Sequence, residues 1–222
     1  MGEIILFTQS LLKRYGAIKM YENIINELQN NKNTDYSISY VENIADKILA
    51  ESDRANIIGA IPIVKIVEEF GFEPYAIKPF NENESGNIYI GGTTEDEFGS
   101  DKIMIVDIHE ELYHQRFILA HELAHYLFDY LGNNQYVQNP NILFSAAYLK
   151  DGHGRNDNGR ERLADRFAAE LLMPAKQFLI QFIKIKDIFN NDKDFVVKYL
   201  SKCFKTKPSS IIRRIEELDL TL

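Results

Sequence analysis

The pattern of apolar residues predicts three helices followed by a small sheet in the first half of the chain. Apolar side chains recur with helical spacing over residues 8–29 and again over 39–50. Pro62 suits the first turn of a short helix that ends before Gly71. Three later segments are short, rich in β-branched or aromatic residues, and bounded by turn residues, which predicts about three strands. These strand segments are 72–78, 86–91 and 102–107.

The second half of the chain is predicted to be mainly helical. A helix is expected over 111–131, where Gly132 ends it, and a polar loop over 133–158 leads to a helix over 159–172. Met173-Pro174 breaks the pattern, and short helices follow up to the amphipathic run 211–218. Together these elements predict an α+β fold with a small sheet packed against the helix over 111–131.

Composition limits the class of protein without changing this picture. The chain has 222 residues, of which 45% are hydrophobic and 26% charged, as in ordinary globular proteins. The longest apolar runs are too short to cross a bilayer, and the N-terminal residues do not resemble a signal peptide. A single cysteine, Cys203, excludes an intramolecular disulfide and a cysteine metal cluster. A cytoplasmic location and no contact with a membrane are therefore expected.

Charge is unevenly distributed along the chain. The net charge is −8, yet residues 174–222 hold 10 Lys+Arg and 6 Asp+Glu and are +4. We expect a helical extension over 1–35, a main domain over 36–173 and a C-terminal helical subdomain over 174–222. Two helices of this subdomain could form a pair resembling a helix-turn-helix that contacts DNA or a repressor. The other interpretation, a packing subdomain with a solvated lysine face, is favoured because base-reading side chains are sparse on its last helix.

The central chemical signal is the sequence His121-Glu122-Leu123-Ala124-His125. Residues four apart lie on one face of a helix, so both imidazoles can reach one metal ion. Glu122 lies beside the first histidine, on the side where a metal-bound water would be. This is the arrangement that a zinc hydrolase needs, although the motif also arises by chance on amphipathic helices. A third ligand is required to decide between the two.

Glu161 is the candidate third ligand, and Asp165 follows it by one helical turn. A glutamate ligand followed by an acid that holds a ligand histidine through its other ring nitrogen recurs in zinc peptidases. The competing interpretation is a solvated charged face, because Arg162 and Arg166 alternate with these acids. Beside the histidine pair, the metal site is the better interpretation.

Two segments resemble the ImmA/IrrE family of metallopeptidases. Residues 116–125, Arg-Phe-Ile-Leu-Ala-His-Glu-Leu-Ala-His, look like its active-site helix, and residues 161–174 look like its second signature. The similarity covers about residues 40–220. It implies a zincin-like fold and proteolysis of a helix-turn-helix repressor, often in mobile elements or stress regulation. One departure is Asp165, where many members have asparagine.

The resemblance also implies roles for the site residues, and these agree with the spacing argument. His121, His125 and Glu161 would hold one zinc ion per chain with a fourth position open for water, and Glu122 would be the catalytic acid and base. The same donors would also hold manganese. His153, in the polar loop, is a candidate oxyanion donor with Tyr148 or Arg155 as rivals, and an exposed loop histidine is the competing interpretation.

Two classes of function follow from this site. The first is a zinc endopeptidase with a narrow protein substrate, a DNA-binding repressor. The second is a regulatory module that binds a protein or DNA and carries a structural or vestigial metal site. An open fourth position on the metal favours the enzyme, whereas a fourth protein ligand favours the module.

Overall fold

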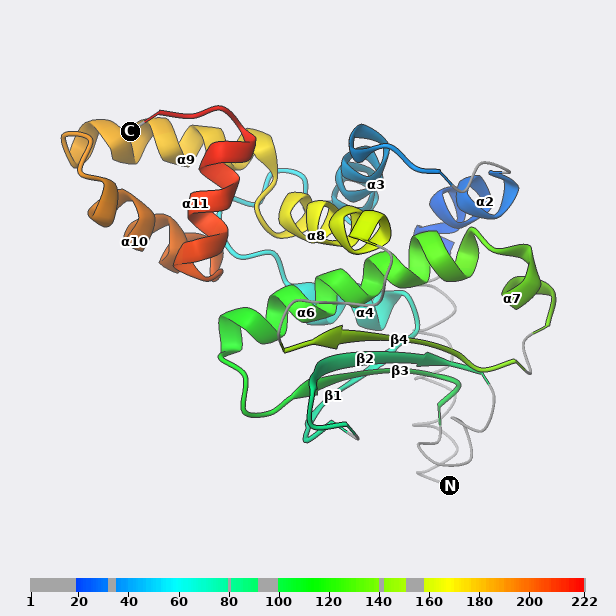
Figure 1. Cartoon of the computed structure of the whole chain (residues 1–222). Coiled ribbons are helices and arrows are strands. Elements are labelled where there is room, and N and C mark those ends of the chain that lie inside the picture. The colour runs from blue at the N-terminus through cyan, green and yellow to red at the C-terminus, as the bar shows by residue number, and fades with distance from the viewer. Residues whose placement is uncertain are drawn as a thin grey trace, which may run out of the picture.

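The computed structural model confirms an α+β fold in which helices cover one face of a four-stranded mixed sheet (Figure 1). Its helices outnumber its strands among the described residues. No helix in this part of the chain has both the length and the apolar character needed to cross a bilayer. The structure describes residues 19–31, 35–79, 81–91, 100–139, 142–150 and 158–221.

The sheet has the strand order β1-β3-β2-β4. β1 runs parallel to β3, and both other pairings are antiparallel. β1 and β4 are therefore the two edge strands. The bounds are Glu73–Ile77 for β1, Glu84–Ile90 for β2, Lys102–Asp107 for β3 and Phe144–Leu149 for β4, so the three predicted strands are confirmed.

The edge strand β4 lies inside the segment 133–158 that the sequence predicts to be a loop, together with the short helix α7 (Asn134–Gln138). The centre of β4 is Ser-Ala-Ala, which carries almost no β-branched or aromatic signal. Its strand form comes instead from pairing with β2, for example Ile88 opposite Ala146. Such pairing between distant segments is not visible in a local pattern.

Helix α6 (Leu112–Ala124) crosses the face of the sheet (Figure 1). Gly86 on β2 allows the close approach, because a Cβ atom there would lie 2.1 Å from Cγ2 of Ile118. The helix predicted over 111–131 is α-helical only as far as Ala124. From His125 to Leu131 it continues as a π-helix, η1. A π-helical turn within a helix often marks a functional site.

Four further helices complete the core around α6 and η1. The predictions over 39–50, 62–71 and 159–172 are confirmed, and α8 packs between α3 and α6. The prediction over 8–29 is confirmed in α2, but residues 1–18 lie outside the described residues. The bounds are Glu22–Asn30 for α2, Ile38–Glu51 for α3, Ile63–Glu69 for α4 and Asn158–Leu172 for α8.

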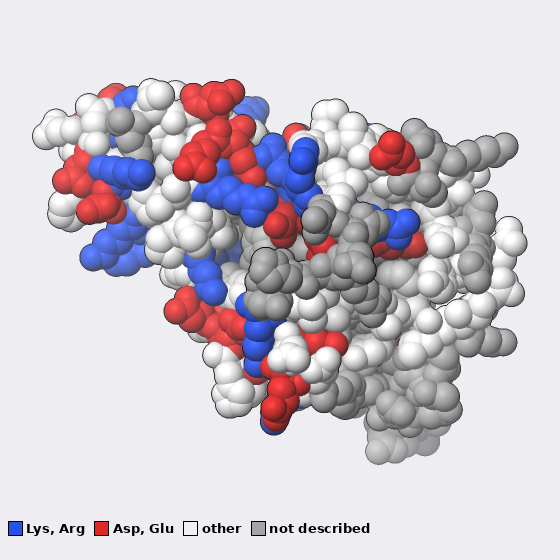
Figure 2. Space-filling view, viewed as in Figure 1, with Lys and Arg blue, Asp and Glu red and all other residues white. Residues whose placement is uncertain are grey.

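Three C-terminal helices form a cluster at one end of the molecule (Figure 1). They are α9 (Ala175–Ile188), α10 (Lys193–Phe204) and α11 (Pro208–Glu217). Acidic and basic side chains gather where α11 meets α8 (Figure 2). The division of the chain at residues 35 and 173 stays a prediction.

Candidate metal centre

Two helices supply the residues that the sequence predicts to hold a metal. His121 lies in the last turn of α6, and His125 is the first residue of η1, one turn further on. Glu161 lies in the first turn of α8, which crosses α6. Local helix geometry therefore pairs the two histidines, and only the packing of α8 against α6 brings in the glutamate.

Three side chains bring their donor atoms together at this crossing. Nε2 of His121 lies 3.1 Å from Nε2 of His125 and 3.1 Å from Oε2 of Glu161, and Nε2 of His125 lies 3.5 Å from Oε1 of Glu161. Two ligand atoms bound tetrahedrally to one zinc ion, each about 2.05 Å from it, are about 3.3 Å apart. The donor set therefore has the size and the chemistry that a single divalent ion requires.

Each imidazole is oriented through its other nitrogen. Nδ1 of His121 lies 3.1 Å from Oδ1 of Asp165, as the sequence predicts, and Nδ1 of His125 lies 2.6 Å from Oδ2 of Asp129. Both Nε2 atoms are thereby left to face the metal position. Sequence reasoning missed Asp129, although it follows His125 by one helical turn and that spacing could have revealed it.

The carboxylates make this point of the molecule favourable for positive charge. Burial alone would lower the pKa of His125, but Asp129 and Glu161 raise that pKa to about 10. Burial likewise opposes the rise in the pKa of His121, which Asp165 and Glu161 cause. The imidazoles in turn hold the pKa of Glu161 well below its usual value, although burial opposes this. An electrostatic environment that stabilises protonated imidazoles also suits a bound cation.

Glu122 is fully buried beside the two histidines. Neither of its carboxylate oxygens has a hydrogen-bond partner among the described residues. Burial raises the pKa of this carboxyl, and the neighbouring imidazoles only partly offset the rise. A buried acceptor without a partner is costly in a folded protein, so it calls for a functional explanation.

Tyr148 on β4 lies against the same site. Its ring packs edge-on against His121 with the centroids 4.8 Å apart. Burial and the nearby carboxylates raise the pKa of its hydroxyl to about 12, so it stays protonated and able to donate a hydrogen bond. His153 and Arg155, the other candidate oxyanion donors, lie outside the described residues.

Two cavities lie beside the site, and β4 lines both. They measure about 230 Å³ and about 290 Å³. The cavity of about 230 Å³ is lined by His125, Glu161 and residues 144–147. The cavity of about 290 Å³ is lined by Tyr148, Asp165 and the start of α11. The edge strand therefore runs past the metal position with open space at both ends.

The family of the chain follows from a comparison with known proteins. Residues 81–215 match the sequence profile of peptidase family M78, described as the IrrE N-terminal-like domain. This range is well over half of the chain and includes both motifs. The chain belongs to peptidase family M78. No curated protein matches it.

Membership of family M78 confirms the resemblance to ImmA/IrrE peptidases and a metallopeptidase type of function. It agrees with the geometry, since His121, His125 and Glu161 are a group that could hold a metal ion. A peptidase of this family acts on protein, so the substrate class is a polypeptide.

Proposed function

We propose that this M78 peptidase is a zinc-dependent endopeptidase in which His121, His125 and Glu161 hold the ion. The observation that carries the proposal is the convergence of the three side chains, with the two Nε2 atoms 3.1 Å apart and an oxygen of Glu161 3.1–3.5 Å from each, beside the unpartnered carboxylate of Glu122. Manganese would fit the same nitrogen and oxygen donors, because affinity alone does not select the ion.

The bound ion would lower the pKa of a coordinated water and polarise the carbonyl of the scissile peptide bond. Glu122 would accept the proton of the attacking water and pass it to the leaving amine. Its position next to His121 and its lack of competing hydrogen bonds leave both oxygens available for this transfer. Asp165 and Asp129 would keep the Nδ1 protons in place so that the Nε2 lone pairs face the ion.

The proposed substrate is a protein segment in extended form. β4 is an edge strand, and an extended peptide can add to such an edge through backbone hydrogen bonds. The cavities at both ends of β4 would then receive side chains on either side of the scissile bond. In line with the resemblance to ImmA/IrrE peptidases, we propose a cytoplasmic helix-turn-helix repressor as the natural substrate.

Metal removal tests this function. We expect the purified chain to hold one zinc ion, measured by mass spectrometry of its metal content, and to cleave members of a proteome-derived peptide library. A chelator should stop cleavage and added zinc should restore it, because the ion supplies the Lewis acid. Purified repressors from neighbouring genes would then be assayed for the same cleavage. Cleavage that persists in metal-free protein would contradict the proposal.

Of the three candidate oxyanion donors, Tyr148, His153 and Arg155, the first two are distinguished by their variants. Because the ring of Tyr148 packs against His121, we expect Tyr148→Phe to lower kcat by about 10²-fold with unchanged zinc content. We expect His153→Ala to lower kcat less than about threefold. The opposite result, with a large loss in His153→Ala alone, would assign the role to the loop histidine.

The alternative function, a regulatory binding module, has less support. A structural metal site would have a fourth protein ligand, and no further histidine, cysteine or acid joins the three-residue group within the described part of the chain. The module also needs cations on the last helix that are available to a partner. Arg213 and Arg214, the two arginines of α11, are instead engaged with carboxylates of this chain.

A further inference from the structure

The last helix of the chain reaches the metal centre through one arginine. Nη1 of Arg213 on α11 lies 3.1 Å from Oδ2 of Asp165 on α8. The other oxygen of the same carboxylate, Oδ1, lies 3.1 Å from Nδ1 of His121. The two oxygens of Asp165 therefore have different partners, an arginine of the C-terminal cluster on one side and a candidate metal ligand on the other.

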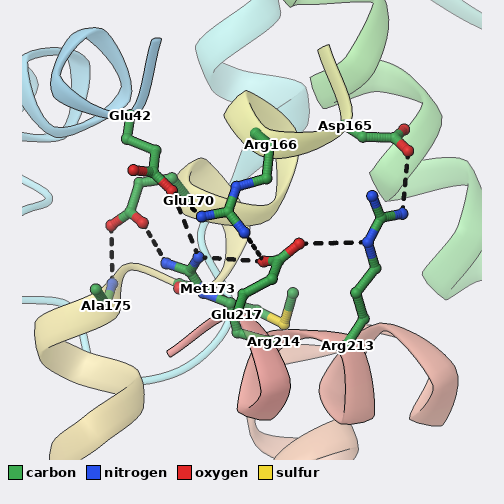
Figure 3. A network of polar contacts seen from close by, with 9 residues as sticks. All are labelled: Glu42, Asp165, Arg166, Glu170, Met173, Ala175, Arg213, Arg214 and Glu217. Carbon is green, nitrogen blue, oxygen red and sulfur yellow. Dashed lines mark hydrogen bonds and ion pairs between the residues drawn. The ribbon is translucent and has the colours of Figure 1, made fainter. Parts of the chain in front are cut away.

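A second carboxylate, that of Glu217, also restrains Arg213, although the side chain of Arg213 is 54% exposed. Its Nε lies 3.3 Å from Oε1 of Glu217, one turn further along α11 (Figure 3). The other oxygen of Glu217 lies 2.8 Å from Arg166 and 3.4 Å from Arg214. The planar guanidinium of Arg213 thus bridges two carboxylates with separate nitrogen atoms, a geometry that restricts its rotation.

The ion pairs that extend from Glu217 anchor α11 to the rest of the protein. Arg214 is fully buried and contacts Glu170 of α8 and the carbonyl of Met173 (Figure 3). Arg166 extends the network to Glu42 on α3, at 2.6 Å. The position of Arg213 therefore depends on buried contacts, whereas an ordinary surface arginine would be free to move.

From this geometry we infer that Arg213 is a positioning residue of the metal centre, acting on His121 through Asp165. A carboxylate with one partner can turn about its Cβ–Cγ bond and pair with water, and Asp165 is partly exposed. The contact with Arg213 fixes the second oxygen, so the first stays directed at Nδ1 of His121. The C-terminal helix thereby contributes to the orientation of a metal ligand that lies 92 residues earlier in the chain.

This inference rests on the proposed metal site, and metal affinity tests it directly. We expect Arg213→Gln to weaken zinc binding by about 3- to 10-fold, somewhat less than the 10- to 100-fold typical when a residue that contacts a ligand directly is lost. Affinity would be measured by competition with a chromogenic chelator. The visible spectrum of the Co²⁺-loaded protein would report the accompanying change in ligand geometry.

Two further variants separate positioning from charge. Arg162→Gln removes the same charge from an exposed site on α8 and should leave zinc affinity unchanged. Arg213→Lys keeps the charge, but one ammonium group cannot reproduce the planar contact with both carboxylates, so it should restore affinity only in part. Full restoration by lysine, or an equal loss in Arg162→Gln, would mean that charge alone acts and would overturn the inference.

A double-mutant cycle tests whether Arg213 acts through Asp165. In an Asp165→Asn background, Arg213→Gln should change zinc affinity by less than about twofold. An equal loss in both backgrounds, or no loss in the wild-type background, would overturn the inference while leaving the metal site in place. Failure of the unmodified chain to bind zinc would instead overturn the metal site itself, and the inference with it.

Discussion

Glu122→Gln is expected to lower the rate of peptide cleavage by about 10³-fold or more while the protein keeps its zinc. The amide has nearly the same shape as the carboxylate but cannot accept a proton, and general base catalysis contributes about 10²- to 10⁴-fold. Zinc should remain because Glu122 is not among the three donors that converge at the metal position. The measurement is kcat/KM on the best peptide from the library, together with the zinc content of each preparation.

A matched control for this variant is Glu111→Gln, which changes an exposed glutamate at the start of the same helix. Its side chain makes no capping hydrogen bond, so turnover should be unaffected. A Glu122→Gln protein that cleaves at the unmodified rate would show that another group accepts the proton. The proposed metal ligands would then survive, but the proposed mechanism would not.

Arg214→Met is expected to lower the free energy of unfolding by about 3–5 kcal/mol, the cost typical of removing one partner from a buried ion pair. Arg214 is fully buried, and its loss leaves the buried carboxylate of Glu170 without its cation. Burial already raises the pKa of Glu170 even with the arginine present. Urea unfolding followed by circular dichroism, with linear extrapolation, gives the free energy directly.

A second substitution tests the cause of this loss. In the Arg214→Met background, Glu170→Gln should recover part of the stability, because it removes the unpaired charge and keeps an acceptor for the backbone N–H of Ala175. By contrast, Arg213→Gln should lower the free energy of unfolding by less than about 1 kcal/mol. The side chain of Arg213 is largely exposed, and ion pairs of exposed side chains contribute little to stability. A loss below about 1 kcal/mol in Arg214→Met would show that the buried network contributes little to stability.

Several features could be predicted because they depend only on residues that are close together in the sequence. The histidine pair needs only one helical turn, and β3 carries a dense run of β-branched residues, so both are visible in the local sequence. The π-helix from His125 was not predicted, because α- and π-helical turns present similar apolar patterns. Residues 1–18 and His153 lie outside the described residues, so the expectations for them stay predictions.

The charged residues show most clearly where local patterns stop being informative. An arginine in a basic helix has the same sequence pattern whether it meets DNA, water or a carboxylate. Arg214 belongs to the C-terminal basic segment, yet packing against α8 makes it a fully buried partner of Glu170. Asp129 likewise reads as an ordinary surface acid until the imidazole of His125 beside it is located.

The sequence by itself therefore determined the α+β class, the family and the two histidines on one helical face. The class and the histidine pair follow from spacing and composition within short segments, where the covalent chain itself holds the residues near one another. The family follows from the resemblance of two short motifs to those of known peptidases. Only the tertiary structure decided that Glu161 meets both imidazoles, that β4 borders the site as an edge strand, and that Arg213 reaches Asp165. Each of these contacts joins segments far apart in the chain, and its geometry depends on how whole helices and strands pack.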